Sequence, residues 1–183
     1  MPLIEDLEWL LVPSRGFSCE PDIQIVPRRP SWDDYAMNLA GVVATRSEDP
    51  WLKVGAVLMR ADHSIASVGY NGSAPGAENI NWHDRDGRRK YVIHAEVNAL
   101  RYARPGEIEF CASTTMPCTA CMAQLAAFGV KRVAYRDHLP STVYNEDDVL
   151  AVARASGMTV YQWPLQAPQQ PTVAQGATES SNE

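Results

Sequence analysis

Two short segments of metal-binding side chains constrain this chain more than any other feature. They are His94-Ala95-Glu96 and Pro117-Cys118-Thr119-Ala120-Cys121, and each stands where a helix is expected to begin. Cys118 and Cys121 are three residues apart, so they lie on one face of their helix, and the positive helix end favours both thiolates. With His94 they offer three ligands for one zinc ion.

Three protein ligands leave one position of a tetrahedral zinc ion open, which is typical of a catalytic site. Glu96 follows His94 by two residues, so both are expected in or just before the first helical turn, with Glu96 beside the open position. There Glu96 can take a proton from water and deliver it to a ring nitrogen, while hydroxide attacks the carbon that bears an exocyclic amine. H-x-E followed by P-C-x-x-C is the signature of zinc-dependent nucleobase deaminases.

Each segment has a simpler interpretation when it is taken alone. C-x-x-C is also typical of a redox pair or occurs incidentally, and H-x-E on a helix is mostly incidental. A structural zinc site would need a fourth ligand, and the remaining candidates do not stand at a paired spacing: His63, His83, His138, Cys19 and Cys111. Cys111 falls in a predicted strand, where core packing is its expected role. The two segments together, in this order, favour a deaminase.

The 183 residues divide into one domain with a tail at each end. Residues 31–163 form the predicted zinc deaminase domain. Residues 1–30 are rich in proline and are expected to form an irregular arm, with one short helix near Leu7–Val12. Residues 164–183 are rich in Gln, Pro, Ser and Thr and are expected to be a disordered tail.

Charge and hydropathy exclude several classes of partner. The net charge of −6 does not resemble the basic field of a protein that binds long nucleic acid. No apolar run approaches the roughly 20 residues that span a bilayer, which argues against a membrane partner. The acidic N-terminus lacks the basic start of a signal peptide, so we expect a cytoplasmic protein.

The hydrophobic pattern predicts an α/β domain with the element order α-β-β-α-β-α-β-α-β. Expected helices span 31–47, 94–103, 118–128 and 146–155. Expected strands span 54–59, 64–70, 107–113, 131–135 and 159–163, and residues 71–90 form a long loop. The alternation implies parallel pairing of the later strands and helices on both faces. Ser31 is the expected N-cap of the first helix, whose predicted buried stripe is Tyr35, Leu39, Val42 and Val43.

Beyond the metal-binding segments, residues 31–163 resemble the deoxycytidylate (dCMP) deaminase family of the cytidine-deaminase-like superfamily. The segments that carry this resemblance are Ser31-Trp32-Asp33-Asp34-Tyr35-Ala36-Met37, Arg46-Ser47-Glu48-Asp49-Pro50, Val54-Gly55-Ala56, Gly69-Tyr70-Asn71-Gly72 and Phe128-Gly129-Val130-Lys131-Arg132-Val133. Arg-Ser-x-Asp-Pro with Gly-Tyr-Asn-Gly is more specific to this family than the metal motif. One departure is Pro75, which comes one residue later than usual.

The resemblance implies a three-layer α/β/α sandwich with a central five-stranded mixed sheet, assembly as a homo-oligomer, and regulation by dCTP and dTTP. It implies that Asn71 contacts the sugar and that the backbone N–H of Ala95 contacts the base carbonyl. The predicted reaction is the conversion of dCMP to dUMP. Alternatives are deamination of dCTP, of a 5-substituted dCMP, of a free nucleoside or of adenosine in tRNA. A catalytically silent nucleotide-binding protein is a further alternative, against which an intact Glu96 argues.

A 5′-phosphate is close to a dianion at neutral pH, so a site that selects it needs cations or oriented N–H donors. Segment 82–91 offers four basic residues just before His94, namely Arg85, Arg88, Arg89 and Lys90. Arg136 is expected just past strand 131–135, at the edge where ligands bind in this fold class. The alternative interpretation of segment 82–91 is a solvated basic loop or an oligomer contact. The candidate substrate contacts are Asn71, Ala95, Pro117, Arg88, Arg89 and Arg136.

Overall fold

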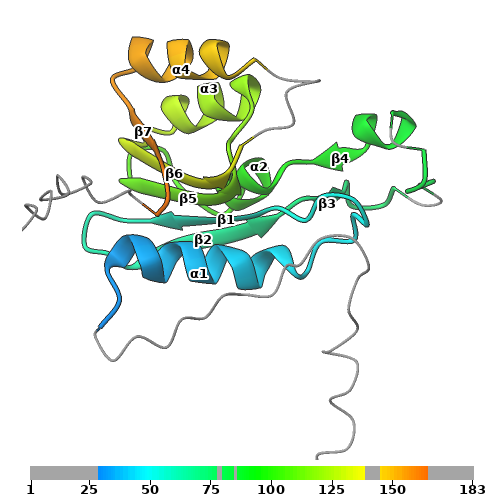
Figure 1. Cartoon of the computed structure of the whole chain (residues 1–183), viewed down its shortest axis with the longest axis horizontal. Helices are drawn as coiled ribbons and strands as arrows, with labels where there is room; N and C mark the ends of the chain where they lie inside the picture. Colours follow the sequence, from blue (N-terminus) through cyan, green and yellow to red (C-terminus); the bar gives the residue numbers. More distant parts are fainter. Residues whose placement is uncertain (1–28, 78–79, 85, 139–144, 165–183) are drawn as a thin grey trace, which may run out of the picture.

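The computed structural model describes residues 29–77, 80–84, 86–138 and 145–164, and a five-stranded sheet runs through their centre (Figure 1). Its strands are β1 (Gly55–Met59), β2 (Ile65–Tyr70), β5 (Phe110–Thr115), β6 (Arg132–Asp137) and β7 (Thr159–Gln162). They lie in the order β2-β1-β5-β6-β7. β1 pairs antiparallel with β2 and β5, whereas β5, β6 and β7 are parallel, as predicted for the later strands.

Helices cover both faces of this mixed sheet, which confirms the predicted α/β/α sandwich. The four α-helices of the described residues are α1 (Trp32–Ala44), α2 (Ala95–Leu100), α3 (Thr119–Ala127) and α4 (Glu146–Ala155). One apolar cluster joins α1 to one face of the sheet, and a second joins α2, α3 and α4 to the opposite face (Figure 1). None of the helices in the described part of the chain is long and apolar enough to cross a bilayer.

The start of α1 is as predicted, but its buried face differs from the expected one. Ser31 Oγ accepts a hydrogen bond from the Asp34 backbone N–H at 3.1 Å, and the Asp34 carboxylate accepts one from the Ser31 backbone, which completes a capping box. Tyr35 and Val42 were expected inside, yet they are 42% and 49% exposed. Val43 is buried as predicted and Leu39 is partly buried against the apolar cluster that joins α1 to the sheet, but the other buried residues are Ala36, Met37, Ala40 and Ala44.

Close approach of the helices to the sheet explains this difference. A Cβ atom on Gly55 of β1 would lie 2.1 Å from the carbonyl oxygen of Ala40, so only small side chains fit where α1 crosses Gly55. Gly69 of β2 plays the same part for α2, because a Cβ there would lie 2.4 Å from Ala95 O and 2.4 Å from Ala99 N. The hydrophobic pattern favours bulky residues for a buried face, whereas this packing selects alanine.

The strand register brings the ends of several strands together at one edge of the sheet. Gly55, at the start of β1, pairs with Tyr70 at the end of β2, and Ala56 pairs with Ser113 near the end of β5. Ser113 in turn pairs with Tyr135 near the end of β6. The segments that follow β2, β5 and β6 and the one that precedes β1 therefore meet at this edge, where ligands are expected in α/β folds.

The described part of segment 71–90 contains regular secondary structure where the sequence predicts a long loop. It contains β3 (Gly72–Ser73), which pairs with β4 (Val92–Ile93), and the 3₁₀ helix η2 (Gly87–Lys90). Strands of two residues have no period to detect, which is why they were missed. β6 also runs on to Asp137, so Arg136 lies inside the strand rather than past it. The predicted arm helix and the tail from residue 165 lie outside the described residues.

Replacing Gly69 with Ala is expected to lower the free energy of unfolding by about 1–3 kcal/mol, because the new Cβ would push α2 off the sheet. Gly41→Ala is the matched control, since its Cβ would meet nothing closer than Arg136 Nη1 at 3.9 Å. That change lies inside α1 and is expected to stabilise by about 0.5–1 kcal/mol. Urea unfolding measures both. Wild-type stability for Gly69→Ala would contradict the close packing.

Candidate metal centre and active site

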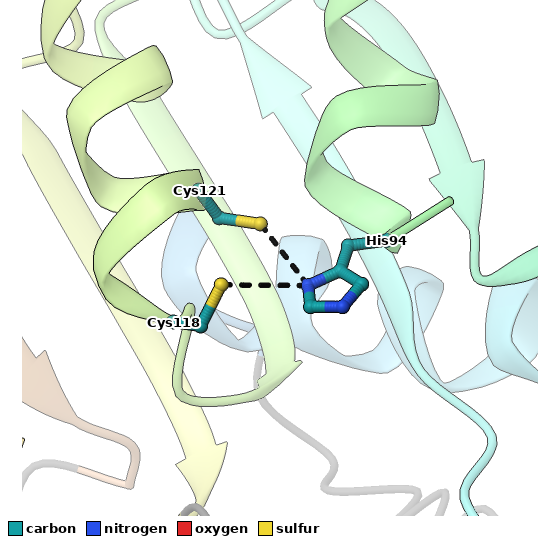
Figure 2. A group of neighbouring side chains, drawn as sticks. All are labelled: His94, Cys118 and Cys121. Atoms are coloured by element: carbon teal, nitrogen blue, oxygen red, sulfur yellow. Dashed lines mark hydrogen bonds between the residues drawn. The ribbon is translucent and has the colours of Figure 1, made fainter. Parts of the chain in front are cut away.

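The starts of α2 and α3 bring three metal-binding side chains to one point. His94 is the N-cap of α2, Cys118 is the N-cap of α3, and Cys121 lies in the first turn of α3. Nδ1 of His94 is 3.5 Å from Sγ of Cys118 and 3.3 Å from Sγ of Cys121 (Figure 2). All three ligand atoms lie within 4.8 Å of one another, as the sequence predicts.

These separations fit a tetrahedral zinc ion. Zinc–nitrogen bonds of about 2.0 Å and zinc–sulfur bonds of about 2.3 Å place nitrogen and sulfur about 3.5 Å apart. The two measured distances from His94 Nδ1 match that value, so the side chains need little rearrangement to close around the ion. One imidazole and two thiolates leave the fourth position of zinc for a ligand from outside the chain.

The three ligands share protons before a metal binds. Cys118 is the thiolate of the pair, because hydrogen bonds from Cys121 and His94 lower its pKa to about 4. The neighbouring thiolate raises the pKa of Cys121, and the hydrogen bond to Cys118 raises the pKa of His94. A zinc ion must displace the protons held by Cys121 and His94, so metal affinity falls as the pH falls.

Glu96 lies beside the three ligands in the first turn of α2. Its side chain is buried, with only 3% of the residue exposed, and Oε1 accepts a hydrogen bond from Ser113 Oγ at 3.0 Å. Burial raises the pKa of the Glu96 carboxyl, and a hydrogen bond between Glu96 and Cys121 contributes to the raised pKa of that thiol. A carboxyl group that can be protonated is therefore placed next to the metal ligands without belonging to their set.

Ala95 and Pro117 are buried next to the ligands, and Asn71 lies at the same sheet edge. Asn71 Oδ1 accepts a hydrogen bond from the Val54 backbone N–H at 2.8 Å, and Nδ2 donates one to the Leu52 carbonyl at 2.9 Å. The side chain therefore holds the segment that leads into β1. The predicted contact of Asn71 with a sugar stays a prediction.

Arg88 of η2 is committed to a buried ion pair, which the sequence did not reveal. Its Nη1 pairs with Oδ2 of Asp49, and both residues are buried. Asp49 Oδ1 also accepts hydrogen bonds from the backbone N–H groups of Trp51 and Leu52 at 2.8 and 3.1 Å. Nε of Arg88 has no hydrogen-bond partner within the described residues. Asp49 belongs to the Arg-Ser-x-Asp-Pro segment, but spacing alone could not pair it with a residue 39 positions away.

Arg89 and Arg136 differ in their surroundings. The Arg89 side chain is 46% exposed and contacts Asp86 at 3.6 Å, so its guanidinium is accessible. Arg136 bonds to Asp137 at 2.9 Å. Side chains alternate along β6, so Arg136 shares the α1 face of the sheet with Ala134, opposite the helices that carry the metal ligands. The structure does not bring Arg136 together with those ligands.

Comparison with known proteins agrees with this geometry. Residues 30–136 match the family model of the cytidine and deoxycytidylate deaminase zinc-binding region. The deoxycytidylate deaminase of mycobacterium phage D29 is 32% identical over 123 residues, covering 58% of this chain and 95% of the phage protein. The chain belongs to the dCMP deaminase family.

Two further proteins are similar to this member of the dCMP deaminase family. The deoxycytidylate deaminase of Schizosaccharomyces pombe is 35% identical over 150 residues, which cover 74% of the chain but only 45% of the yeast protein. The chain thus spans less than half the length of that relative. The crystal structure of cyanophage S-TIM5 dCMP deaminase in complex with dCMP and dUMP superposes with a TM-score of 0.59 and 26% identity, covering 74% of this chain and 98% of the phage chain.

Removal of one metal ligand tests the zinc site. Cys121→Ala is expected to leave less than one zinc per chain after dialysis, because two ligands hold the ion far more weakly than three. Cys111→Ala is the matched control, since Cys111 is a buried cysteine of β5 outside the ligand set and its loss should leave zinc in place. Elemental analysis of both purified variants gives the answer. A fully loaded Cys121→Ala protein would contradict the assignment.

Proposed function

We propose that this chain hydrolyses dCMP to dUMP and releases ammonia. The observation that carries the proposal is the buried carboxyl of Glu96 beside His94, Cys118 and Cys121, in a chain that belongs to the dCMP deaminase family. The relative from phage D29, of which the chain covers nearly the whole length, is named for the same activity. A structural neighbour is described in complex with both dCMP and dUMP.

Glu96 is the proposed proton carrier of the reaction. Zinc, when bound by the three ligands, supplies a Lewis acid that activates water for attack. Glu96 takes a proton from water and passes it to the ring nitrogen of cytosine; the remaining proton on the added oxygen then passes to the exocyclic amine, which leaves as ammonia as the new carbonyl forms. Burial raises the pKa of Glu96, which lets the carboxyl hold the proton between the two transfers.

Backbone geometry next to the metal ligands supports the proposed contact with the base. Ala95 is the first residue of α2, where a backbone N–H has no partner inside the helix. That N–H lies between His94 and Glu96 in the sequence, so a base placed for the reaction comes close to it. We propose that it donates a hydrogen bond to the base carbonyl.

The basic segment around η2 is the proposed phosphate site. The Arg89 guanidinium is accessible, whereas Nη1 of Arg88 is held by Asp49 and the buried Nε of Arg88 has no hydrogen-bond partner in the described part of the chain. Lys90 stands next to both and adds a further positive charge. We propose that Arg89 supplies the main charged contact, with Arg88 in support; Arg136, on the opposite face of the sheet, stays a weaker candidate.

We further propose that residues 31–163 form the zinc deaminase domain and that the protein acts as a homo-oligomer on free nucleotides. The net charge of −6 favours small substrates over long nucleic acid. The resemblance implies dCTP and dTTP as candidate effectors. The cytoplasmic location stays a prediction.

Replacement of Glu96 by Gln tests the proton-transfer role. The variant is expected to keep one zinc per chain, because the three ligands remain, and to lose turnover by about 10²–10⁴-fold, because an amide cannot carry the proton. Ammonia release and elemental analysis on the same preparation measure both quantities. Wild-type turnover, or an empty metal site, would show that Glu96 has another role.

Preference for the phosphate tests the substrate. We expect kcat/KM for dCMP to exceed that for deoxycytidine by at least roughly 10- to 150-fold, the value of one charged hydrogen bond of about 1.5–3 kcal/mol. Arg89→Gln should shrink this ratio and leave the slow nucleoside reaction unchanged. Arg101→Gln, at the far end of α2, is the control and should change neither.

The same ammonia assay separates the alternatives. Equal rates on dCMP and deoxycytidine would contradict a nucleotide substrate. Faster turnover of dCTP, a 5-substituted dCMP or an adenosine compound would move the assignment within the deaminases. Absence of turnover on the whole panel by a zinc-loaded protein would favour the silent nucleotide-binding protein.

A further inference from the structure

The side chain of Ser113, which lies in the sheet, forms a hydrogen bond with the Glu96 carboxyl. It lies in β5, is fully buried, and its Oγ donates a hydrogen bond to Glu96 Oε1 at 3.0 Å. The two residues come from different elements, 17 positions apart in the sequence. Because Glu96 is buried as well, this bond is made where water cannot easily replace it.

Of the consecutive β5 residues 113–115, only Ser113 is placed to contact Glu96, because of the direction in which each side chain points. Side chains alternate across the sheet, so Ser113 faces α2 and α3 together with Cys111. Thr114 faces the α1 side, where its Oγ1 accepts a hydrogen bond from the Gly55 backbone N–H at 3.1 Å. Thr115 faces the same side as Ser113 but lies one step nearer the strand end, and no hydrogen bond joins it to Glu96 among those of the described residues.

An ionised carboxylate has two equivalent oxygens, either of which can accept a proton, and only one of them should face the reacting atoms. The Ser113 hydroxyl, by donating to Oε1, stabilises that oxygen without a proton and limits rotation of the carboxylate. Oε2 is then the oxygen left to hold the transferred proton. We propose that Ser113 is a positioning residue that makes Glu96 use Oε2 for both proton uptake and proton release.

The proton balance of this proposal is simple, and it rests on the proposed role of Glu96. One proton of water resides on Oε2 and passes to the ring nitrogen of the substrate. The second proton, left on the oxygen bound to the attacked carbon, passes to the amine, which leaves as ammonia while that oxygen becomes the carbonyl. The proton of Ser113 stays on Oγ throughout, so the serine is neither an acid nor a base in the reaction. Loss of its hydroxyl should therefore slow the chemical step and leave substrate binding unchanged.

Ser67 offers a matched control for a purely structural role. It is also buried, and its Oγ donates a hydrogen bond to the carbonyl of Ala99 at 2.7 Å, so it anchors the same helix α2 to the sheet. It bonds to the far end of the helix rather than to Glu96. If Ser113 only anchored α2, removal of either hydroxyl would have the same kind of effect.

The experiment compares Ser113→Thr with Ser113→Val in the zinc-loaded, full-length protein. Both add similar volume in the same place, and only threonine keeps the hydroxyl. We expect Ser113→Val to have a kcat at least about 10-fold below that of Ser113→Thr, with equal KM for dCMP and equal zinc content. Equal kcat values would overturn the proposal. If the larger side chains disturb folding, Ser113→Ala against Ser67→Ala gives the same decision, with the loss of kcat expected only at Ser113.

A second measurement does not depend on turnover. Ser113→Ala should lower the urea midpoint of unfolding in the wild-type protein but much less in the Glu96→Ala background, because its partner is already absent. Ser67→Ala should lower the midpoint equally in both backgrounds. Equal effects of Ser113→Ala in both would overturn the contact itself. Since this cycle needs no substrate, a wrong substrate assignment would leave it intact and would show only in the assay with dCMP.

Discussion

The structure depends on the meeting of two helix starts at one edge of the sheet. α2 and α3 both begin there, and their first residues bring His94 to within 3.5 Å of Cys118 and 3.3 Å of Cys121. This convergence requires α2 to lie very close to β2, which Gly69 permits by having no side chain. It also places Glu96, the proposed proton carrier, in the first turn of α2, so the packing of α2 on β2 positions both His94 and Glu96.

Much of this arrangement could be predicted from the sequence because it depends on the spacing of residues that are close together in the chain. The interval between Cys118 and Cys121 fixes them on one helix face, and the Ser31 cap and the parallel later strands follow from equally local signals. The exposed stripe of α1 could not be predicted in the same way. Hydrophobicity favours Tyr35 and Val42 for burial, whereas the fit against Gly55 excludes bulky side chains there.

Contacts between distant segments account for the rest of what the sequence did not show. The pair of Arg88 with Asp49 and the bond of Ser113 to Glu96 join residues from different elements, with no spacing rule to link them. Arg88 was therefore a candidate phosphate contact in the sequence, whereas its guanidinium forms a buried ion pair with Asp49 in the structure. Arg136 was misplaced because β6 ends two residues later than predicted, so Arg136 lies within the strand with its side chain on the α1 face.

If the zinc-loaded chain acts as proposed, oxygen from water replaces the amine of dCMP. The direct measurement is the reaction of the full-length protein with dCMP in ¹⁸O-labelled water, with ammonia, dUMP and isotope content determined together. We expect one ammonia for each dUMP and one labelled oxygen at the carbon that carried the amine. A protein that holds one zinc per chain but releases no ammonia from dCMP would contradict it.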